Sequence, residues 1–233
     1  MTAQNLVQKN FSTIRQWVAD QSPLTPAESK HSQQGYSSKT YIYNNNGMKL
    51  VLKTPAQSRF LTRLSKQLLK NEYKAYQKLD GIKGIPHCYG FIDDKILVLE
   101  YIENDDFCQR VINQSHNFYQ QFFLLLHEIH NHGVSHGDLK RKDNILVADN
   151  ETPYLIDFGT AVISKPGFHP INHFLFNQLK RIDFNAYLKH KYQKNYTNIS
   201  DEDNEIYRPT IMEGMARSIR NIFKWLLRGF KNF

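Results

Sequence analysis

The order of apolar and polar positions divides the chain into a strand-rich first part and a helical second part. Residues 5–20 carry apolar side chains at helical spacing, which predicts a first helix. The segments 36–43 and 48–53 are rich in aromatic and β-branched residues, which favour strands. The Asn and Gly residues of 44–47 tolerate positive φ angles and predict a hairpin turn between these two strands.

Residues 57–79 form a long predicted helix with two distinct faces. One face is basic and carries Arg59, Arg63, Lys66, Lys70, Lys74 and Lys78. The other face is apolar and carries Phe60, Leu61, Leu64, Leu68, Ala75, Tyr76 and Leu79. At about 100° per residue, the only acidic side chain of this segment, Glu72, falls on the apolar face. A carboxylate that points into a core is costly without a cationic partner, so we expect Glu72 to meet one.

Two further strands and a second long helix complete the pattern. The strands are predicted at 88–92 and 95–101, with a turn at Asp93 and Asp94 between them. Residues 117–132 place their apolar side chains on one side of a helix that ends at Gly133. The first hundred residues are therefore mostly strands plus one long helix, and the remainder is mostly helical. This order predicts an α+β fold in which an α+β lobe joins an α lobe.

The composition agrees with a folded, globular chain. Of 233 residues, 40% are hydrophobic and 22% are charged, and this length supports one large domain or two small lobes that share a cleft. No run approaches about 18 uninterrupted apolar residues, and residues 1–11 lack the pattern of a signal peptide, so we expect neither a transmembrane helix nor a leader. Cys88 and Cys108 form neither a disulfide framework nor a zinc-binding spacing, which favours a reducing, cytoplasmic setting. The formal net charge of +8 indicates an acidic partner, but leaves nucleotide, nucleic acid and membrane open.

Two motifs in the second part carry the chemistry. The segment 134–147 reads VSHGDLKRKDNILV, and Asp157 follows Asp138 by nineteen residues within the sequence YLIDFG. Together the motifs resemble the catalytic loop and the metal-binding Asp-Phe-Gly motif of the protein kinase-like family. The resemblance implies a bilobal kinase-like fold with a β-rich N-lobe and a shortened helical C-lobe.

The resemblance implies a role for each polar residue of these motifs. Asp138 matches the catalytic Asp, which orients the acceptor hydroxyl and takes up its proton. Lys140 matches the lysine that neutralises the transferred phosphate, and Asn144 and Asp157 match the ligands of Mg²⁺. The loop is one residue longer than the usual pattern, so either Asp143 or Asn144 could present the metal ligand. We prefer Asn144, because it keeps its step to the following apolar strand.

The same resemblance implies nucleotide-binding residues in the first part. Lys53, in the sequence LVLK, matches the lysine that holds the α- and β-phosphates of ATP, and Glu72 matches the helix glutamate that pairs with it. The helical periodicity places Glu72 inward independently of the family. Gly35 is the one glycine retained where the Gly-rich loop is expected. Glu100 and Ile102 lie in LEYI, which resembles the hinge whose backbone binds the adenine edge.

Two departures from the family pattern narrow the resemblance. Gly137 stands where an arginine usually precedes the catalytic Asp, and no Ala-Pro-Glu motif follows Gly159. A shortened helical lobe of this kind resembles the small bacterial lipopolysaccharide-core (Kdo/heptose) kinases and the RIO-type atypical kinases. The similarity covers roughly residues 30–190. We therefore predict four regions: an N-terminal helical extension at 1–29, the N-lobe at 30–102, the C-lobe at 103–212, and a basic amphipathic helix at 213–233.

The last segment, 217–233, predicts a helix with one basic and one apolar face. The basic face carries Arg217, Arg220, Lys224, Arg228 and Lys231. The apolar face carries Ile219, Ile222, Phe223, Leu226, Phe230 and Phe233. This pattern is typical of a helix that lies on a membrane surface. It fits equally a helix that packs its apolar face on the C-lobe, and the sequence leaves both interpretations open.

These observations predict an ATP-dependent, Mg²⁺-using kinase that phosphorylates a hydroxyl acceptor, with a lipopolysaccharide or glycolipid sugar preferred. Two alternatives are a RIO-like protein Ser/Thr kinase and a non-catalytic kinase-like binding module at the membrane surface. We expect a cytoplasmic location, or a peripheral one on the inner face of the cytoplasmic membrane, with residues 217–233 on an anionic membrane surface. No zinc finger or aromatic single-strand platform is visible, so we expect no sequence-specific nucleic-acid partner. We interpret His136 as a packing residue and assign no metal to His127, His130 and His132.

Overall fold

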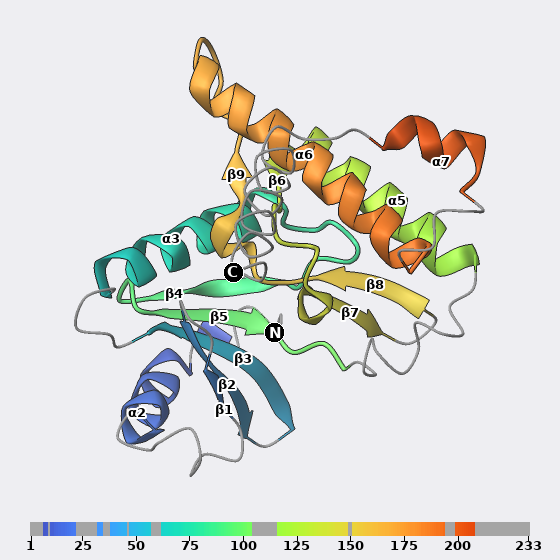
Figure 1. Cartoon of the computed structure of the whole chain (residues 1–233). Helices are drawn as coiled ribbons and strands as arrows, with labels where there is room; N and C mark the ends of the chain where they lie inside the picture. Colours follow the sequence, from blue (N-terminus) through green and yellow to red (C-terminus); the bar gives the residue numbers. More distant parts are fainter. Residues whose placement is uncertain are drawn as a thin grey trace, which may run out of the picture.

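An antiparallel sheet occupies the first part of the chain in this computed structural model (Figure 1). The structure describes residues 7–8, 10–21, 32–34, 38–45, 47–56, 62–103, 116–148, 151–193 and 199–207. Within these ranges the five strands of the sheet lie in the order β1-β2-β3-β5-β4. The strands are β1 (Ser32–Gln34), β2 (Ser38–Asn45), β3 (Met48–Pro55), β4 (Cys88–Ile92) and β5 (Ile96–Glu100).

One helix packs on each face of this sheet, because successive side chains of a strand point to opposite faces. Helix α2 (Phe11–Gln21) packs in one apolar cluster with Leu50 and Leu52 of β3. Helix α3 (Thr62–Lys78) packs on the other side, in a cluster with Leu97 and Leu99 of β5. Lys53 follows Leu52, so the alternation directs it toward α3, where an ion pair holds it.

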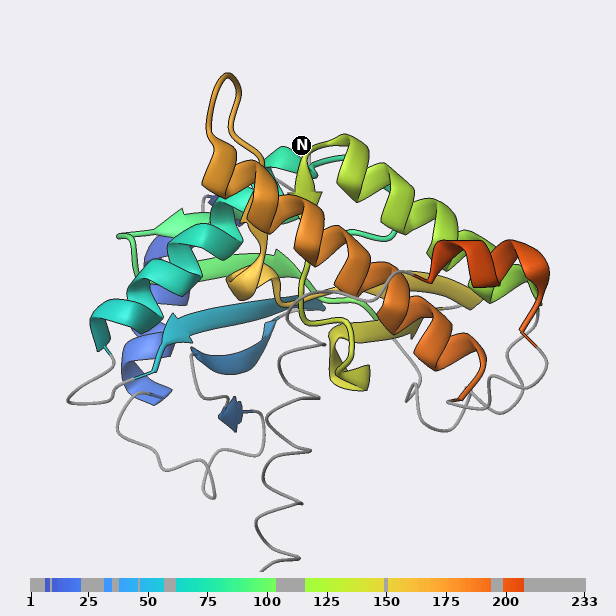
Figure 2. The same cartoon turned by 45° about the horizontal axis from the view of Figure 1, so that its top comes forward.

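The second part of the chain is built around two long helices, α5 (His116–Asn131) and α6 (Pro170–Lys191), which lie side by side in both views (Figures 1 and 2). Phe122 of α5 and Tyr187 of α6 pack edge to face with their ring centroids 5.7 Å apart. Short elements connect the two helices: β6 (Val134–Ser135), η2 (Lys142–Asn144), β7 (Ile145–Ala148), β8 (Thr152–Leu155), η4 (Phe158–Thr160) and β9 (Val162–Ile163). A short helix, α7 (Asp201–Ile206), follows α6.

The structure confirms the predicted α+β class and most of the predicted elements. The hairpin of 36–53 is present as β2 and β3, with Asn45 opposite Met48. The helix predicted at 117–132 is α5, and the turn between β4 and β5 holds Asp93 and Asp94 at positive φ. The additional strand β1 was not predicted from the sequence, and it pairs with β2.

One assignment on the long helix is wrong. Leu64 was predicted on the apolar face of the 57–79 helix, but it is 55% exposed. At about 100° per residue it lies about 80° from Glu72, at the edge of the buried face. Residues 57–61, the first residues of that prediction, lie outside the described ranges, as does the predicted helix at 217–233. The four predicted regions stay predictions.

Among the helices of the described ranges, none has the length and apolar character needed to cross a bilayer.

Candidate active site

Three charged side chains meet between the sheet and α3. The Lys53 Nζ atom lies 2.6 Å from Oε1 of Glu72 and 3.4 Å from Oδ1 of Asp157. Lys53 and Glu72 are only 6% and 2% exposed, so each charge depends on the other for compensation. The structure thus brings together the cation and the inward carboxylate that helical periodicity left without a partner.

The charges of this cluster fix the protonation of its members. Burial lowers the pKa of Lys53, but the Glu72 and Asp157 carboxylates outweigh it, so the pKa lies above its usual value. Burial acts to raise the pKa of Asp157, but the charge of Lys53 outweighs burial, so the pKa of Asp157 lies below its usual value. Lys53 is therefore a cation and Asp157 an anion at neutral pH, side by side at the same site.

Asp157 adopts an unusual backbone conformation that its neighbours maintain. Its φ of 68° and ψ of 64° lie in the left-handed region, which is costly for a residue other than glycine. The next residue, Phe158, is buried, and its ring packs against Tyr76 of α3 and against His136. The Asn71 Nδ2 atom donates to the carbonyl oxygens of Gly159 and Ala161 at 3.1 Å and 2.7 Å. These contacts fasten η4 to α3, so Asp157 stays directed at Lys53.

Asp138 and Asn144 form the second half of the site. The Asn144 Nδ2 atom donates to the backbone oxygen of Asp138 at 3.0 Å and to its Oδ2 at 3.2 Å. Asn144 is buried, whereas the side chain of Asp143 is exposed, with its carboxylate 3.6 Å from Arg141. Both bonds of Asn144 use its nitrogen, so the amide oxygen is the atom that can face a metal. The geometry favours Asn144 over Asp143 as the candidate ligand.

His136 links the two halves through its ring. Its Nε2 atom donates to the carbonyl oxygen of Ile156, at 2.9 Å, directly before Asp157. The backbone N–H of Asp138 donates to the Nδ1 atom at 3.3 Å, which fits the same tautomer. The fully buried ring therefore supports the backbone of both acidic residues, in agreement with the interpretation of His136 as a packing residue.

Asp183 is a buried acid of the candidate site that the sequence analysis did not single out. This carboxylate of α6 is fully buried and accepts hydrogen bonds from the backbone N–H groups of His136, at 2.8 Å, and Gly137, at 2.7 Å. The Nε2 atom of His130 on α5 lies 3.0 Å from the same carboxylate. In the sequence, the one available signal was an acid amid apolar positions of a helix, the signal that identified Glu72.

The structure also explains why glycine stands at position 137. Its φ is +81°, which disfavours other residues, and an added Cβ would lie 3.0 Å from the side chain of Leu179 on α6. Leu179 therefore occupies the space that a side chain at position 137 would need.

The other predicted site residues lie at the margins of this cluster. The Lys140 side chain is exposed, and Gly35 lies outside the described residues. The N–H of Glu100 donates to the His87 carbonyl at 2.9 Å, and the Ile102 side chain is buried. The roles assigned to these residues stay predictions.

The donor set suits a metal–phosphate ligand. The Asp157 carboxylate and the Asn144 amide oxygen are ligands of the type that Mg²⁺ prefers. The Lys53 ammonium offers a cation for a phosphate group at the same place. Among the described residues, no group of three His, Cys, Asp or Glu side chains forms a metal site. Asp157 and Asn144 supply two ligand groups, and Mg²⁺ bound by few protein ligands keeps water and substrate phosphate in its other positions.

Comparison with known proteins agrees with this geometry. Residues 34–178 match the family model described as the protein kinase domain. The chain is 30% identical over 131 residues to the casein kinase I homolog RAG8 of Kluyveromyces lactis, covering 49% of this chain and 24% of the relative. It is 34% identical over 99 residues to the fowlpox virus protein named probable serine/threonine-protein kinase FPV226, covering 37% of this chain and 33% of the relative. It is 26% identical over 133 residues to calcium-dependent protein kinase 34 of Arabidopsis thaliana, covering 52% and 25%. The chain thus spans about a quarter to a third of the length of these curated relatives.

Proposed function

Because this chain belongs to the protein kinase family, we propose that it transfers the γ-phosphoryl group of ATP to a hydroxyl acceptor. The observation that carries the proposal is the buried contact of Lys53 with both Glu72 and Asp157. These residues come from β3, α3 and the segment before η4, and a site for a metal-bound phosphate needs this combination of charges. The same completeness favours a catalyst over a non-catalytic kinase-like binding module.

Each residue of the site has a role in this proposal. Lys53 binds the α- and β-phosphates, and Glu72 holds the Lys53 side chain in place. Asp157 and Asn144 hold Mg²⁺, which supplies charge neutralisation for the phosphates. The Asp138 carboxylate orients the acceptor hydroxyl and accepts its proton, while Asn144 fixes the position of that carboxylate. Lys140 neutralises the transferred phosphate.

For the acceptor, we propose a glycolipid sugar such as that of a lipopolysaccharide core. Only ten residues, 160–169, separate the Asp-Phe-Gly motif from α6, which leaves little chain to support an extended peptide. A serine or threonine of a protein is the second candidate, as for a RIO-like kinase. The names of the relatives, which are protein kinases, favour this alternative.

Radiolabelled ATP offered in parallel to protein, glycolipid and small-sugar fractions tests the activity and separates the two acceptors. The Asp138→Asn variant should lose about a hundredfold or more of the transfer rate, because it cannot accept the hydroxyl proton. Asp143→Asn is the matched control, since this neighbouring side chain is exposed, and it should retain transfer. Undiminished transfer by Asp138→Asn would show that the assigned role is wrong.

Nucleotide binding is tested separately by thermal stabilisation. Mg²⁺ with ATP should raise the Tm of the wild-type protein and of Asp138→Asn, and should raise that of Asp157→Ala less. If Mg²⁺ and ATP leave the wild-type Tm unchanged, the nucleotide-binding proposal fails.

A further inference from the structure

The loop between β9 and α6 ends in a group of exposed apolar side chains. Phe168 is 90% exposed and Ile171 is 76% exposed, and Phe174 and Leu175 on the next turn of α6 are also exposed. We call residues 165–175 the α6 tip; it projects from the molecule at the N-terminal end of α6 (Figures 1 and 2). Large apolar side chains that gather on a surface mark an interaction site more often than single ones do.

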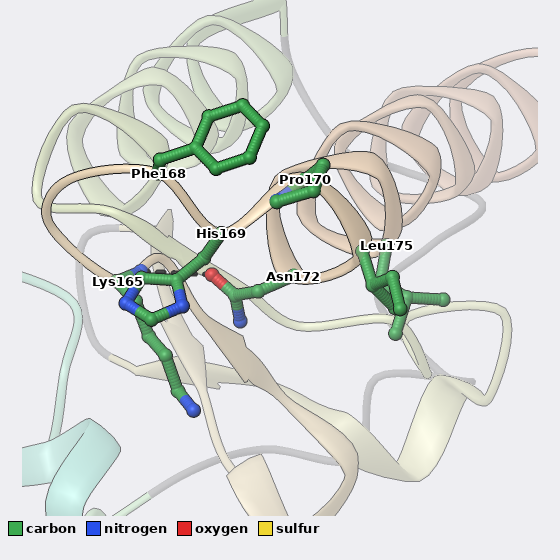
Figure 3. A pocket seen from close by; sticks show the side chains of 7 residues that line it. Lys165, Phe168, His169, Pro170, Asn172 and Leu175 are labelled. Carbon is green, nitrogen blue, oxygen red and sulfur yellow. Dashed lines mark hydrogen bonds between the residues drawn. The ribbon is translucent and has the colours of Figure 1, made fainter.

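Hydrogen bonds hold the α6 tip in one conformation. The Lys165 N–H donates to Oδ1 of Asn172 at 2.8 Å, and Nδ2 of Asn172 donates to the Ile163 carbonyl at 3.0 Å. The Nε2 atom of His173 donates to the Lys165 carbonyl at 2.8 Å. Figure 3 shows Phe168 projecting from this braced loop, away from Lys165. The loop that carries Phe168 is therefore tied at its base by three hydrogen bonds.

A pocket of about 350 Å³ lies within the α6 tip, lined by Lys165, Pro170, Ile171 and Leu175 among others (Figure 3). Its walls are mostly apolar side chains, and a cationic lysine stands among them. This combination suits a ligand with an apolar part and an anionic group.

The segment of the chain that contains the α6 tip carries basic residues and no acidic ones. Between Phe158 and Ile182 the sequence contains no Asp or Glu, while Lys165, Lys180 and Arg181 are basic. Lys78 of the basic α3 face also lies nearby: its Nζ atom and Ser164 both approach the position of a Cβ added to Gly133. Exposed aromatic and aliphatic side chains beside cations, without acids, match the chemistry of an anionic lipid surface.

We propose that the α6 tip docks on an anionic lipid bilayer, with Phe168 and Ile171 entering the boundary between headgroups and acyl chains and Lys165 binding lipid phosphates. The α6 tip is a different segment of the chain from the predicted helix at 217–233. It goes beyond the kinase proposal, because it rests on this surface alone and holds for a glycolipid or a protein acceptor. Ile171 lies eight residues before Leu179, or about 12 Å along the helix, and Leu179 borders Gly137 of the catalytic loop. Docking would therefore bring the catalytic loop close to the membrane.

Flotation of the full-length chain with lipid vesicles, without nucleotide, tests this proposal. Vesicles of phosphatidylcholine with phosphatidylglycerol should bind the wild-type protein, and vesicles of phosphatidylcholine alone should bind it less. The double variant Phe168→Ser/Ile171→Ser should lower the partition coefficient about tenfold or more, because two apolar side chains leave the interface. Lys165→Glu should also weaken binding, and added salt should reduce the difference between the two vesicle types.

Leu124→Ser is the matched control, since Leu124 is a 60% exposed apolar residue on α5, outside the α6 tip. It should bind vesicles as the wild-type protein does, and all variants should keep the wild-type circular dichroism spectrum. If the double variant binds the anionic vesicles as strongly as the wild-type protein does, the proposal is wrong, whether or not deletion of 217–233 abolishes binding. A wild-type protein that does not bind the anionic vesicles, or that self-associates through the α6 tip instead, also overturns it. Because no nucleotide is present, a failed phosphotransfer assay does not affect this outcome.

Discussion

Replacement of Asp183 should disable the catalytic loop while leaving the nucleotide-anchoring charges in place. Its carboxylate is fully buried and accepts the N–H groups of His136 and Gly137, the two residues directly before Asp138. Lys53 and Asp157 belong to other segments, and the ion pairs that Lys53 makes within the described residues are with Glu72 and Asp157 rather than with Asp183. Asp183 is thus a positioning residue, and its loss should affect transfer more than nucleotide binding.

The structure gives the size of the effect on stability. Hydrogen bonds from N–H groups to a charged acceptor contribute about 1.5 to 3 kcal/mol each, and a donor left buried without a partner costs a similar amount. Asp183→Ala removes two such bonds and the His130 contact, so we expect a loss of about 3 to 6 kcal/mol in the free energy of unfolding. Asp183→Asn keeps the shape and one acceptor oxygen, so we expect a loss of about 2 to 3 kcal/mol.

Urea denaturation and steady-state kinetics measure both effects. The urea midpoint should fall in the order wild type, Asp183→Asn, Asp183→Ala, with an unchanged m-value. In Asp183→Asn, kcat should fall more than tenfold while the KM for ATP changes little, because a loosened loop misplaces Asp138. Asp80→Ala is the control, since its exposed pair with His87 should contribute less than about 1 kcal/mol. A midpoint for Asp183→Ala as high as that of Asp80→Ala would refute the reasoning, as would equal changes in kcat and KM.

Two further predictions concern packing and pH. Gly84→Ala should lower the free energy of unfolding, measured by urea denaturation, by about 2 to 4 kcal/mol, because φ is +93° and the new Cβ would lie 2.6 Å from the Pro153 oxygen. Gly81→Ala is the control: its φ is +80° and nothing lies within 4 Å of the new Cβ, so it should lower the same free energy by only about 1 kcal/mol. Equal losses in the two variants would contradict the role of the Pro153 contact. The lowered pKa of Asp157 means that its contribution to stability is complete above the usual value of 3.8 and is lost as the pH falls through the lower folded value. The Tm difference between wild type and Asp157→Asn should therefore shrink on acidification below about pH 4, and a constant difference would contradict the ionic contact with Lys53.

Local patterns predicted one residue of the candidate site, and the resemblance to the kinase family supplied the others. Glu72 interrupts an apolar helix face, which predicted that it meets a cation. The resemblance named Lys53 as that cation, and the two side chains lie 2.6 Å apart. Strand alternation and helical periodicity are local rules, so they determine which side of an element a residue faces. They therefore predicted the hairpin of β2 and β3, and the buried face of α5, from short stretches of sequence.

The same rules could not predict which distant segments meet. Asp183 lies 46 residues from Gly137, and nothing in either segment specifies the other as its partner. The exposed α6 tip could not be predicted for a related reason. Ile171 and Leu175 continue the apolar positions of α6, and a periodic pattern does not show that only the later part of the helix is buried. Leu64 was misassigned for the same reason at the start of α3.

Helix α6 connects the catalytic loop with the α6 tip. The Nε2 atom of His190 donates to the Leu139 carbonyl and the Nζ atom of Lys189 to the Lys140 carbonyl, both at 2.7 Å. Together with Asp183, one continuous helix therefore bonds to the backbone of the catalytic loop on both sides of Asp138. The N-terminal end of the same helix carries the α6 tip, and a helix transmits orientation along its axis because its backbone is rigid. A surface that bound the α6 tip would consequently fix the direction in which Asp138 faces, without any change in the site itself.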